Sequence, residues 1–504
     1  MKKIYTIATF GLKGVLVEVE ANLSRHLPKI IVVGLPDMAI QEAKERVWAA
    51  IENSNVKFPR QKVVINLAPA QIRKEGSSYD LPMAIAVLVA SGDLILPAEK
   101  IAFIGELSLN GELKAVSGTL VMVASLKERG FKQVFLPEAN AKEASLISGI
   151  DIFALANLSQ LVNHFAGNIN LAKVPPAAWA EQSVNNFYDF SQISGQLEAK
   201  RALEISAAGG HNILLVGPPG AGKTMLAKSF LSILPPLDFA ESLEISKIYS
   251  LAGLLSQEQY LIQQRLMRSP HHSASVAAMI GGGSWPRPGE ISLAHRSVLF
   301  LDEILEFPRA VLEALRQPLE DKIITVSRIK GSLDFPANFI LLATANPCPC
   351  GYLGDSEHTC MCNHQDIKRY QKRLSGPLLD RIDLHLGLRK VKSIDLVSAS
   401  QLQEKSAVIR QRVLVARQRQ RRRLGKNILN ADMSSSTCRK HCQLEMSTQK
   451  ILNQAVDRID LTARGYFKVL KVARTIADLE NSEDILTKHV LEALQYRNKF
   501  WQSV

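Results

Sequence analysis

Residues 217–224 form a glycine-rich loop, GPPGAGKT, which follows an apolar run and precedes a stretch with helical periodicity. In this context the pattern G-x-x-x-x-G-K-T predicts a phosphate-binding loop, because glycines let backbone N–H groups surround phosphate oxygens. The following helix presents its positive end to the same phosphates. We expect Lys223 to reach the β- and γ-phosphates of ATP and Thr224 to bind Mg²⁺. The predicted nucleotide-binding residues are Gly217, Pro218, Pro219, Gly220, Ala221, Gly222, Lys223 and Thr224.

Two more apolar runs downstream, 297–303 and 338–347, carry polar side chains at their ends. Together with the run 211–217, they predict buried parallel strands between helices, and hence an α/β domain with helices on both faces of the sheet. Polar groups at the carboxyl ends of such strands meet near the phosphate site. Asp302 is then expected to bind Mg²⁺, Glu303 to polarise the attacking water and Asn346 to orient that water. The alternatives are an acidic turn for the first two and a cap or turn residue for Asn346.

These motifs resemble those of AAA+ ATPases, and more closely those of the ComM/YifB family of magnesium-chelatase-like AAA+ proteins. The resemblance covers nearly the whole chain, including the C-terminal segment 462–480. Its motifs are GPPGAGKT (217–224), RSPHHSAS (268–275), GGGSWPRPGEISLAH (281–295), VLFLDE (298–303), LEALRQPLED (312–321), NPCPCGYLGD (346–355) and LSGPLLDRIDLH (374–385). It implies a ring, expected to be a hexamer, that hydrolyses ATP with Mg²⁺ and has a helical lid after its ATPase core.

The resemblance also implies that an arginine from the adjacent subunit completes each ATP site, where a cation stabilises the transition-state charge. Arg381, in LLDRID, matches that position, and Arg373 is a less favoured substitute. An ion pair of Arg381 with Asp380 or Asp383 is the alternative. In the lid, Arg474 is the expected nucleotide-sensing arginine.

Arg464 is the reserve choice for that sensing role. The two lid arginines are ten residues apart on a helical stretch, so they point to different faces and only one is expected to contact the γ-phosphate.

Residues 323–335 predict a β-hairpin, with two β-rich arms and a turn at Lys330-Gly331. The family resemblance implies that this hairpin enters the central pore, as does an insertion within the second helix of the core, in the segment that contains three glycines at 281–283. Arg328 and Lys330 are then expected to contact a DNA backbone. A solvated hairpin tip is the alternative.

His271 and His272 are open to two interpretations, as contacts to nucleotide or DNA and as buried or capping histidines.

Residues 1–165 alternate β-rich runs and helical patterns and predict a separate α/β domain. Segments 74–92 and 105–130 resemble the proteolytic domain of Lon proteases, a fold of the ribosomal S5 domain 2 type that uses a serine–lysine dyad. Ser78 falls at the nucleophile position, but the lysine position holds Leu120. A serine without a base is not activated, so we expect a Lon-like fold without peptidase activity.

Four of the six cysteines lie in the spacing C-x-C-x9-C-x-C, at Cys348, Cys350, Cys360 and Cys362. Four thiolates suit a tetrahedral Zn²⁺ ion, although C-x-C is tighter than the usual C-x2-C spacing. The alternative is a set of free thiols. Cys438 and Cys442 are four residues apart and receive no role. So few cysteines fit a reducing cytoplasm, and no apolar stretch is long enough to cross a membrane.

The formal net charge of +13 points toward an anionic partner. Residues 390–427 hold eleven Lys and Arg against two acids, so +9 of this charge lies in one stretch. There the residues Ile409, Val413, Ala416 and Leu424 predict an amphipathic lid helix with solvated arginine edges, which we prefer to a DNA-binding helix. The domains are therefore expected to be a Lon-like domain (1–165), a linker (166–186), an ATPase core (187–390) and a lid (391–504).

The leading functional hypothesis is an ATP-driven ring that moves on single-stranded or branched DNA through its pore. The family resemblance implies a helicase that promotes branch migration during natural transformation and recombination. A protein-remodelling ATPase is the main alternative, but its pore is expected to carry aromatic side chains, which the predicted tip Arg-Ile-Lys-Gly lacks. A metal-insertion motor like magnesium chelatase is disfavoured, because its ATPase subunit has no Lon-like domain.

Overall fold

The computed structural model divides into two compact units, which are described separately. The first contains Met1–Ala180 and Phe239–Ile262, and the second contains Glu181–Asp238 and Gln263–Val504. The structure describes residues 2–71, 74, 76–177, 179, 188–256, 258–282, 287–328, 331–355, 357–390, 403–426, 428–459 and 461–497, without the side chains of 327, 328 and 331.

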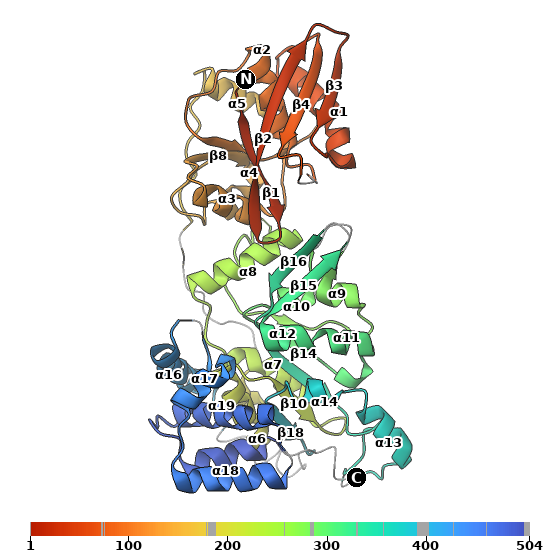
Figure 1. Ribbon diagram of the computed structural model, residues 1–504, viewed down its shortest axis with the longest axis vertical. Coiled ribbons are helices and arrows are strands. Elements are labelled where there is room, and N and C mark those ends of the chain that lie inside the picture. The colour runs from red at the N-terminus through yellow and green to blue at the C-terminus, as the bar shows by residue number, and fades with distance from the viewer. Residues whose placement is uncertain are drawn as a thin grey trace. The chain divides into compact units, whose positions relative to one another are not determined.

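The N-terminal unit is built on a seven-stranded mixed sheet in the order β3-β4-β2-β1-β5-β8-β9 (Figure 1). Its strands are β1 (Ile4–Phe10), β2 (Lys13–Ser24), β3 (Lys29–Val33), β4 (Lys62–Ala68), β5 (Ile101–Phe103), β8 (Gln133–Pro137) and β9 (Asp151–Leu155), with a small ribbon of β6 (Glu106–Leu107) and β7 (Leu113–Lys114). The β-rich runs at 29–35, 62–69, 101–107 and 132–137 form β3, β4, β5 with β6, and β8. Both faces of the sheet carry apolar side chains, so each is covered by helices.

One face packs against α1 (Met38–Asn53), α2 (Asp80–Ser91) and α5 (Leu158–Phe165). The other packs against α3 (Thr119–Glu128), α4 (Glu138–Ala144) and residues of the distant segment 239–262. Ordered chain continues past α5: Lys173 pairs with Phe153 of β9 and the Val174 N–H donates to the Ile152 carbonyl. The first part of the expected linker 166–186 therefore packs onto this unit, while residues 178 and 180–187 lie outside the described residues.

Helix α8 (Phe239–Ala252) belongs to the N-terminal unit although it follows the phosphate-binding loop in sequence (Figure 1). The Gly118 N–H donates to the Ser250 carbonyl at 2.9 Å, and the Ser250 hydroxyl donates to the buried Glu143 carboxylate. Leu261 is buried in the same apolar cluster as α3. The resemblance implied an insertion directed at a pore for the region between the phosphate loop and Asp302. Part of that region, residues 239–262, packs in the first unit, whereas Gly281 and Gly282 of the expected insertion form β12 in the second unit. The pore-directed insertion itself stays a prediction.

The second unit contains a five-stranded, all-parallel sheet in the order β11-β14-β17-β10-β18. Its strands are β10 (Ile213–Val216), β11 (Met267–Arg268), β14 (Val298–Leu301), β17 (Ile340–Ala345) and β18 (Leu384–Gly387). The core helices are α6 (Leu197–Gly209), α7 (Lys223–Ile233), α9 (Val276–Ile280), α10 (Glu290–Leu293), α11 (Arg309–Ala314), α12 (Arg316–Asp321), α13 (His364–Gln371) and α14 (Gly376–Leu379). Every residue of β10, β14 and β17 is buried, as the continuous apolar runs predicted.

Two short hairpins extend from this core. The first pairs β12 (Gly281–Gly282) with β13 (Arg287–Pro288). Gly281 has φ +106°, and a Cβ there would lie 2.1 Å from the Arg287 carbonyl oxygen, so this pairing requires glycine. The second pairs β15 (Ile323–Arg328) with β16 (Gly331–Pro336), which confirms the predicted hairpin. We had expected Gly331 to be a turn residue. It instead begins the second strand, because it pairs with Arg328.

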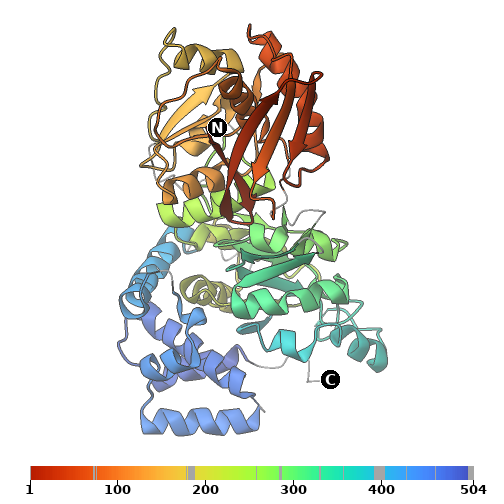
Figure 2. The same cartoon turned by 45° about the horizontal axis from the view of Figure 1, so that its top comes forward.

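The lid consists of α16 (Ser406–Leu424), α17 (Ser435–His441), α18 (Met446–Arg458), α19 (Ala463–Leu479) and α20 (Thr487–Gln495), which lie together in both views (Figures 1 and 2). Its apolar side chains and those of α6 and α7 form one buried cluster. The predicted stripe on α16 is confirmed, because Ile409, Val413 and Ala416 are buried in this cluster and Leu424 packs against it. Lid and core thus share a hydrophobic core.

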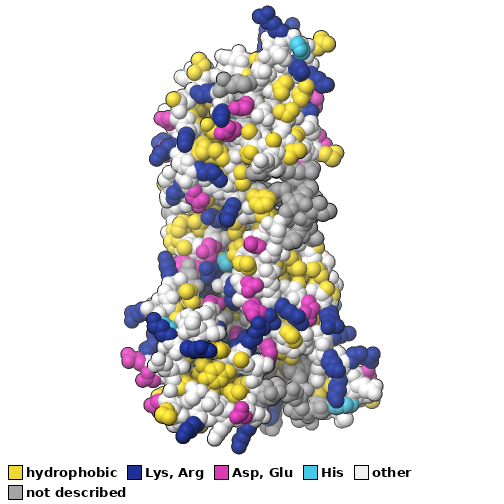
Figure 3. Space-filling view, viewed as in Figure 1, with side chains coloured by type: hydrophobic (Ala, Val, Ile, Leu, Met, Phe, Trp, Pro, Cys, Tyr) yellow, Lys and Arg dark blue, Asp and Glu magenta, His cyan; other side chains and the backbone are white. Residues whose placement is uncertain are grey.

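The arginines that flank this stripe are more engaged than the predicted solvated edges. Arg417 is buried and donates to the Ala207 carbonyl, and Arg423 pairs with the buried Asp478 at 2.6 Å. Arg412 pairs with Glu204 at 2.6 Å. On the face shown in Figure 3, dark blue cationic and magenta acidic side chains are intermixed near the lid. Part of the local +9 charge is therefore used to hold α16 against the core.

No helix among the described residues combines the length and the apolar character that a membrane crossing requires.

His385, on β18, generates a pH prediction for the joint between core and lid. It is buried, and burial together with Arg497 and Lys468 lowers its pKa to about 3, against the weaker opposing effect of Asp383. Because the folded pKa lies below the unfolded value of about 6.5, the neutral imidazole stabilises the fold fully above that pH. This stability is lost as the pH falls from about 6.5 toward 3.

We expect the wild type to lose free energy of unfolding between pH 7 and pH 5, measured by urea unfolding, and His385→Gln to lose roughly 2 kcal/mol less over that interval. The exposed His26 supplies the control, since His26→Gln should keep the wild-type pH dependence. An unchanged pH dependence in His385→Gln would contradict the assignment.

Candidate functional site

The register of three parallel strands brings the predicted catalytic positions to one edge of the sheet. Leu301 of β14 is aligned with Ala343 of β17, and Val216 of β10 is aligned with Ala345. Asp302, Asn346 and the phosphate loop each follow one of these strands directly. The carboxyl ends of parallel strands form the usual ligand-binding edge of an α/β sheet.

The phosphate-binding loop is held between β10 and α7. The Gly217 N–H donates to the Ala345 carbonyl at 3.1 Å, and a Cβ on Gly217 would lie 2.8 Å from the Leu388 carbonyl oxygen. Gly220 and Gly222 have φ near +80°, and Gly222 is the N-cap of α7. The sequence adopts this loop because glycine takes the left-handed conformation at little cost.

The Lys223 ammonium lies inside this loop. Its Nζ donates to the Gly217 carbonyl at 2.6 Å, to the Pro218 carbonyl at 3.0 Å and to Asn346 Oδ1 at 2.9 Å. Burial lowers the pKa of Lys223, while the Asp302 and Glu303 carboxylates act in the opposite direction. The structure thus brings together Lys223 and Asn346, which are 123 residues apart and were predicted to face the same phosphate.

On the other side of the loop, hydroxyl and carboxylate oxygens form a ligand set for Mg²⁺. Thr224 Oγ1 donates to Asp302 Oδ2 at 3.2 Å. The opposite oxygen of Asp302 accepts from Thr344 Oγ1 at 2.5 Å, and the Glu303 N–H donates to the same hydroxyl at 2.9 Å. Oxygen donors of this kind are those that Mg²⁺ prefers, and it usually keeps several waters and binds phosphate as well. The residues present therefore fit a magnesium–nucleotide complex.

Glu303 is exposed and has a left-handed backbone, with φ +51°. That conformation costs on the order of 1 kcal/mol for a residue other than glycine, and such strain concentrates at functional sites. The Thr344 hydroxyl helps to hold it. Sequence reasoning missed Thr344, whose only signal was its position two residues before Asn346.

Arg381 and Arg464 meet at one carboxylate. Arg381 donates to Glu320 of α12 and, at 2.8 Å, to the Pro377 carbonyl, and its side chain is 15% exposed. Arg464, at the start of α19, pairs with the same Glu320 at 2.7 Å. The alternative pairing of Arg381 with Asp380 or Asp383 was therefore wrong, because its acidic partner is Glu320, which sequence reasoning missed.

Arg474 is buried in the lid and its guanidinium is occupied by local partners. It donates to the Glu483 carbonyl at 2.6 Å and to the Ser482 carbonyl at 2.7 Å, and lies 3.3 Å from Asp478. Only 4% of its side chain is exposed. These contacts give Arg474 a structural role, whereas 56% of the Arg464 side chain is exposed. The geometry thus favours the reserve choice for the lid.

The residues predicted to contact DNA are less fully described. Arg328 ends β15, but its side chain lies outside the description, and Lys330 lies outside the described residues altogether. His271 and His272 are exposed, with ring centroids 4.1 Å apart, so they are not buried histidines. His271 Nδ1 lies 2.8 Å from the Ser273 hydroxyl.

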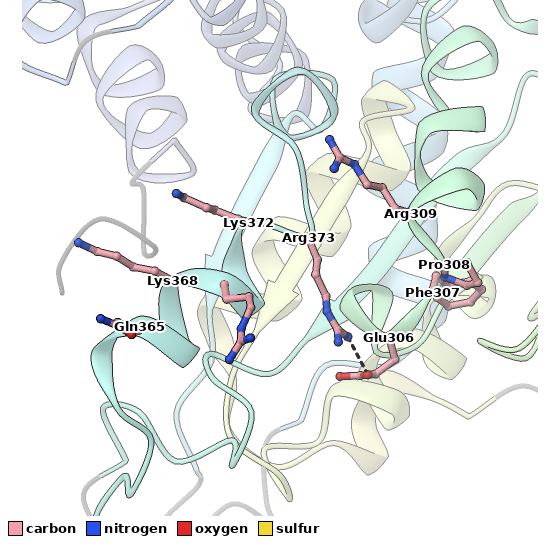
Figure 4. A pocket seen from close by; sticks show the side chains of 9 residues that line it. Glu306, Phe307, Pro308, Arg309, Gln365, Lys368, Lys372 and Arg373 are labelled. Carbon is pink, nitrogen blue, oxygen red and sulfur yellow. Dashed lines mark hydrogen bonds and ion pairs between the residues drawn. The ribbon is translucent and has the colours of Figure 1, made fainter.

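A cationic groove of about 740 Å³, which sequence reasoning did not find, lies between α13 and the segment that leads into α11 (Figure 4). Arg373 is held at its wall by the Glu306 carboxylate at 3.1 Å and the Leu305 carbonyl at 3.0 Å. Five of the lining side chains are basic and one is acidic. The lining residues are Glu306, Phe307, Pro308, Arg309, Gln365, Lys368, Arg369, Lys372 and Arg373.

The four cysteines predicted as metal ligands are brought together. The sulfur atoms of Cys348, Cys350, Cys360 and Cys362 all lie within 4.8 Å of one another. In contrast, Cys438 and Cys442 are buried in the core shared by lid and ATPase, and among the described residues they belong to no group of three or more potential metal ligands.

In the N-terminal unit the position expected for a catalytic lysine is filled by the core. Leu120, in the first turn of α3, is fully buried in the apolar cluster, and its N–H donates to Glu143 Oε1 at 3.0 Å. Ser78, the nucleophile position, is itself 7% exposed. The ammonium of Lys74, a nearby lysine in sequence, donates to the carbonyls of Gly34 and Pro69.

Comparison with known families gives three matches that together span most of the chain. Residues 189–396 match the family described as magnesium chelatase, subunit ChlI, and residues 19–140 match subunit ChlI of Mg-chelatase. Residues 403–497 match the magnesium chelatase, subunit ChlI C-terminal family.

Individual relatives extend this likeness over nearly the full length. The chain is 41% identical to YifB of Escherichia coli over 98% of this chain and 96% of that protein. It is 40% identical to the competence protein ComM of Haemophilus influenzae, over 98% of this chain and 97% of ComM. It is also 25% identical to the archaeal Lon protease of Methanocaldococcus jannaschii, over 22% of this chain and 17% of that protease.

Thr344 supplies a test of the site geometry. Thr344→Val removes the hydroxyl that bonds both the Asp302 carboxylate and the Glu303 N–H, so we expect the rate of ATP hydrolysis to fall by about 10–100-fold. Thr344→Ser keeps the hydroxyl and should retain most of the activity in a phosphate-release assay. Equal rates for Thr344→Val and the wild type would contradict the positioning role.

Proposed function

This chain belongs to the ComM/YifB family of magnesium-chelatase-like AAA+ proteins, and from that premise we propose that it is an ATP-driven ring motor that moves branched DNA. The observation that carries the ATPase part is the single sheet edge where Lys223, Asp302 and Asn346 converge. The DNA part is supported by the 40% identity to a protein named for competence. Our proposal of helicase and branch-migration activity goes beyond what that name states.

The positions of the side chains support the following chemistry for the ATP step. Backbone N–H groups of residues 220–224 and the Lys223 ammonium bind the phosphates, while Thr224 and Asp302 would hold Mg²⁺, which would offset phosphate charge. Glu303, exposed at the edge of the site, accepts a proton from the attacking water, and Asn346 orients that water. Arg381 supplies a cation to the ATP site of the adjacent subunit.

The two ion pairs of Glu320 could couple ATP binding to movement of the lid. In the described conformation one carboxylate holds both Arg381 and Arg464. Each arginine must leave Glu320 to contact phosphate, so ATP binding is linked to release of the lid from α12. The Arg464–Glu320 ion pair is exposed and therefore weak in water, so breaking it costs little free energy.

Contact with DNA is assigned to the β15–β16 hairpin, at Arg328 and Lys330, within the pore of a hexameric ring. Phosphate contacts of Lys and Arg bind DNA without reading its sequence, as a translocating motor requires. A protein-remodelling ATPase is the second candidate, since the N-terminal unit is similar to a Lon protease. The buried Leu120 in place of a catalytic lysine argues that this unit lacks peptidase chemistry.

A branch-migration assay on a labelled four-way junction tests the proposal. We expect ATP-dependent resolution by the wild type and none by Lys223→Ala or Glu303→Gln, with hydrolysis reduced by at least about 100-fold. Lys228, an exposed lysine on the same helix, provides the matched control Lys228→Ala, which should stay active. A wild type that hydrolyses ATP but leaves every junction intact would refute the DNA motor, and ATP-dependent unfolding of a protein substrate would favour the second candidate.

The two lid arginines provide a separate test. Arg464→Ala should slow ATP hydrolysis roughly 10-fold or more while the melting temperature changes little, because the side chain is exposed. Arg474→Ala leaves the Glu483 and Ser482 carbonyl groups without this donor and should lower the melting temperature by several degrees. Thermal unfolding and phosphate release, measured on both variants, decide the assignment. The reverse pattern would restore Arg474 as the sensing residue.

A further inference from the structure

The loop between β17 and α13 begins and ends with a pair of cysteines whose sulfur atoms face one another. The Cys348 and Cys350 sulfurs are 3.4 Å apart, and the Cys360 sulfur lies 3.6 Å from each of them. The Cys362 sulfur accepts from the Cys350 N–H at 3.4 Å. Cysteines that are 12 residues apart in sequence have therefore been folded into one cluster.

These distances match those of ligands around a single metal ion. A tetrahedral ion with Zn–S bonds of about 2.3 Å separates its sulfur atoms by about 3.8 Å. Disulfide sulfurs would be about 2.05 Å apart. An iron–sulfur cluster spreads its four cysteines around several iron atoms, which requires wider separations. The observed spacing fits one ion with four thiolate ligands.

The backbone of the loop is also arranged around sulfur. N–H groups of Gly351 and Leu353 are directed at the Cys348 sulfur, and those of Tyr352 and Met361 at the Cys350 sulfur. Gly351 has φ +85°, which turns the chain between the two cysteine pairs. N–H donors that surround metal-bound thiolates are the outer contacts that orient the ligands of a metal centre.

A second group of potential metal ligands in the same loop differs from the cysteine cluster. Asp355, Glu357 and His358 also lie close together, but they surround a cation that the chain itself supplies. Lys390 Nζ lies 2.9 Å from Asp355 and 3.4 Å from Glu357. No comparable cation is placed against the four sulfurs among the described residues.

We propose that Cys348, Cys350, Cys360 and Cys362 bind one structural Zn²⁺ ion, and that this ion holds the loop against the phosphate-binding site. Thiolate ligands select soft ions, and four protein ligands leave no open position for catalysis. The metal site stands on the cysteine geometry alone. Its effect on the ATP site rests on the proposed function.

Contacts on both sides of the cysteine cluster support the proposed effect of the ion on the phosphate-binding site. Asn346, which accepts from Lys223, lies two residues before Cys348. A Cβ on Gly351 would lie 2.7 Å from Cδ of Pro219, so the first turn of the loop is in close contact with the phosphate-binding loop. At the other side, Gln371 of α13 donates to the Pro347 carbonyl at 3.1 Å. By binding both cysteine pairs, the ion would fix the conformation of the loop that follows Asn346 and contacts Pro219.

The metal is tested by elemental analysis of the full chain, purified under reducing conditions and dialysed to remove loosely bound ions. We expect about one zinc per chain in the wild type and none in Cys360→Ala/Cys362→Ala. The matched control is Cys438→Ala/Cys442→Ala, which removes two buried cysteines of the lid and should keep the zinc. A wild type that remains metal-free after exposure to ZnCl₂, a cluster with iron and sulfide, or equal loss in the lid variant would each overturn the site.

The effect on the ATP site is tested by the affinity for a fluorescent ATP analogue. Removing zinc from the wild type with a chelator should weaken nucleotide binding at least about fivefold, and added zinc should restore it. This reversal distinguishes loss of metal from misfolding of a variant. Unchanged affinity in the metal-free protein would overturn the supporting role. A zinc-loaded wild type that binds no nucleotide would refute both that role and the proposed function, with the metal site retained.

Discussion

Alignment of the parallel strands β14, β17 and β10 is the constraint on which the candidate site depends. Their register places Leu301 beside Ala343 and Val216 beside Ala345, so that residues following three strands converge at one edge. A shift of one residue would reverse the direction of each side chain and separate the Lys223 ammonium from Asn346. Complete burial of the three strands resists such a shift, because it would move side chains that are buried on one face to the other.

Charged side chains in this protein stabilise the fold. The basic stretch on α16 suggested nucleic acid from composition, yet Arg417 and Arg423 are used inside the second unit, on a backbone carbonyl and on the buried Asp478. A buried ion pair is strongly destabilised when one partner is removed, so these arginines are poor candidates for exchange with a DNA phosphate. The cationic groove lined by Lys368 and Arg309 has more solvent-facing charge, although neither its position nor its sign could be read from net charge.

Sequence reasoning was most effective where a local backbone conformation dictates residue type. Gly220 and Gly222 are needed for left-handed turns, and an apolar run before Asp302 predicts a buried strand, so the phosphate loop and its acidic partner were predictable. Contacts between distant segments were not. Glu320 and Arg464 are 144 residues apart, and nothing in the motif around either one indicates the pairing. The choice between Arg474 and Arg464 was open for the same reason, since an arginine that faces the lid interior and one that faces solvent look alike in sequence.

Helix α8 explains why the N-terminal unit differs from a peptidase in more than one residue. The Leu120 N–H, at the position where a catalytic lysine is expected, donates to Glu143, and Glu143 also accepts from Ser250 of α8. Burial raises the pKa of Glu143, and these donors offset part of that effect, so the carboxyl is stabilised by α8 itself. Because α8 comes from the segment that follows the P-loop helix α7, the N-terminal unit is completed by residues of the ATPase sequence. A lysine at position 120 would therefore place an ammonium in an apolar core, next to a Glu143 carboxylate that already accepts hydrogen bonds. This one substitution is insufficient to produce a serine–lysine dyad.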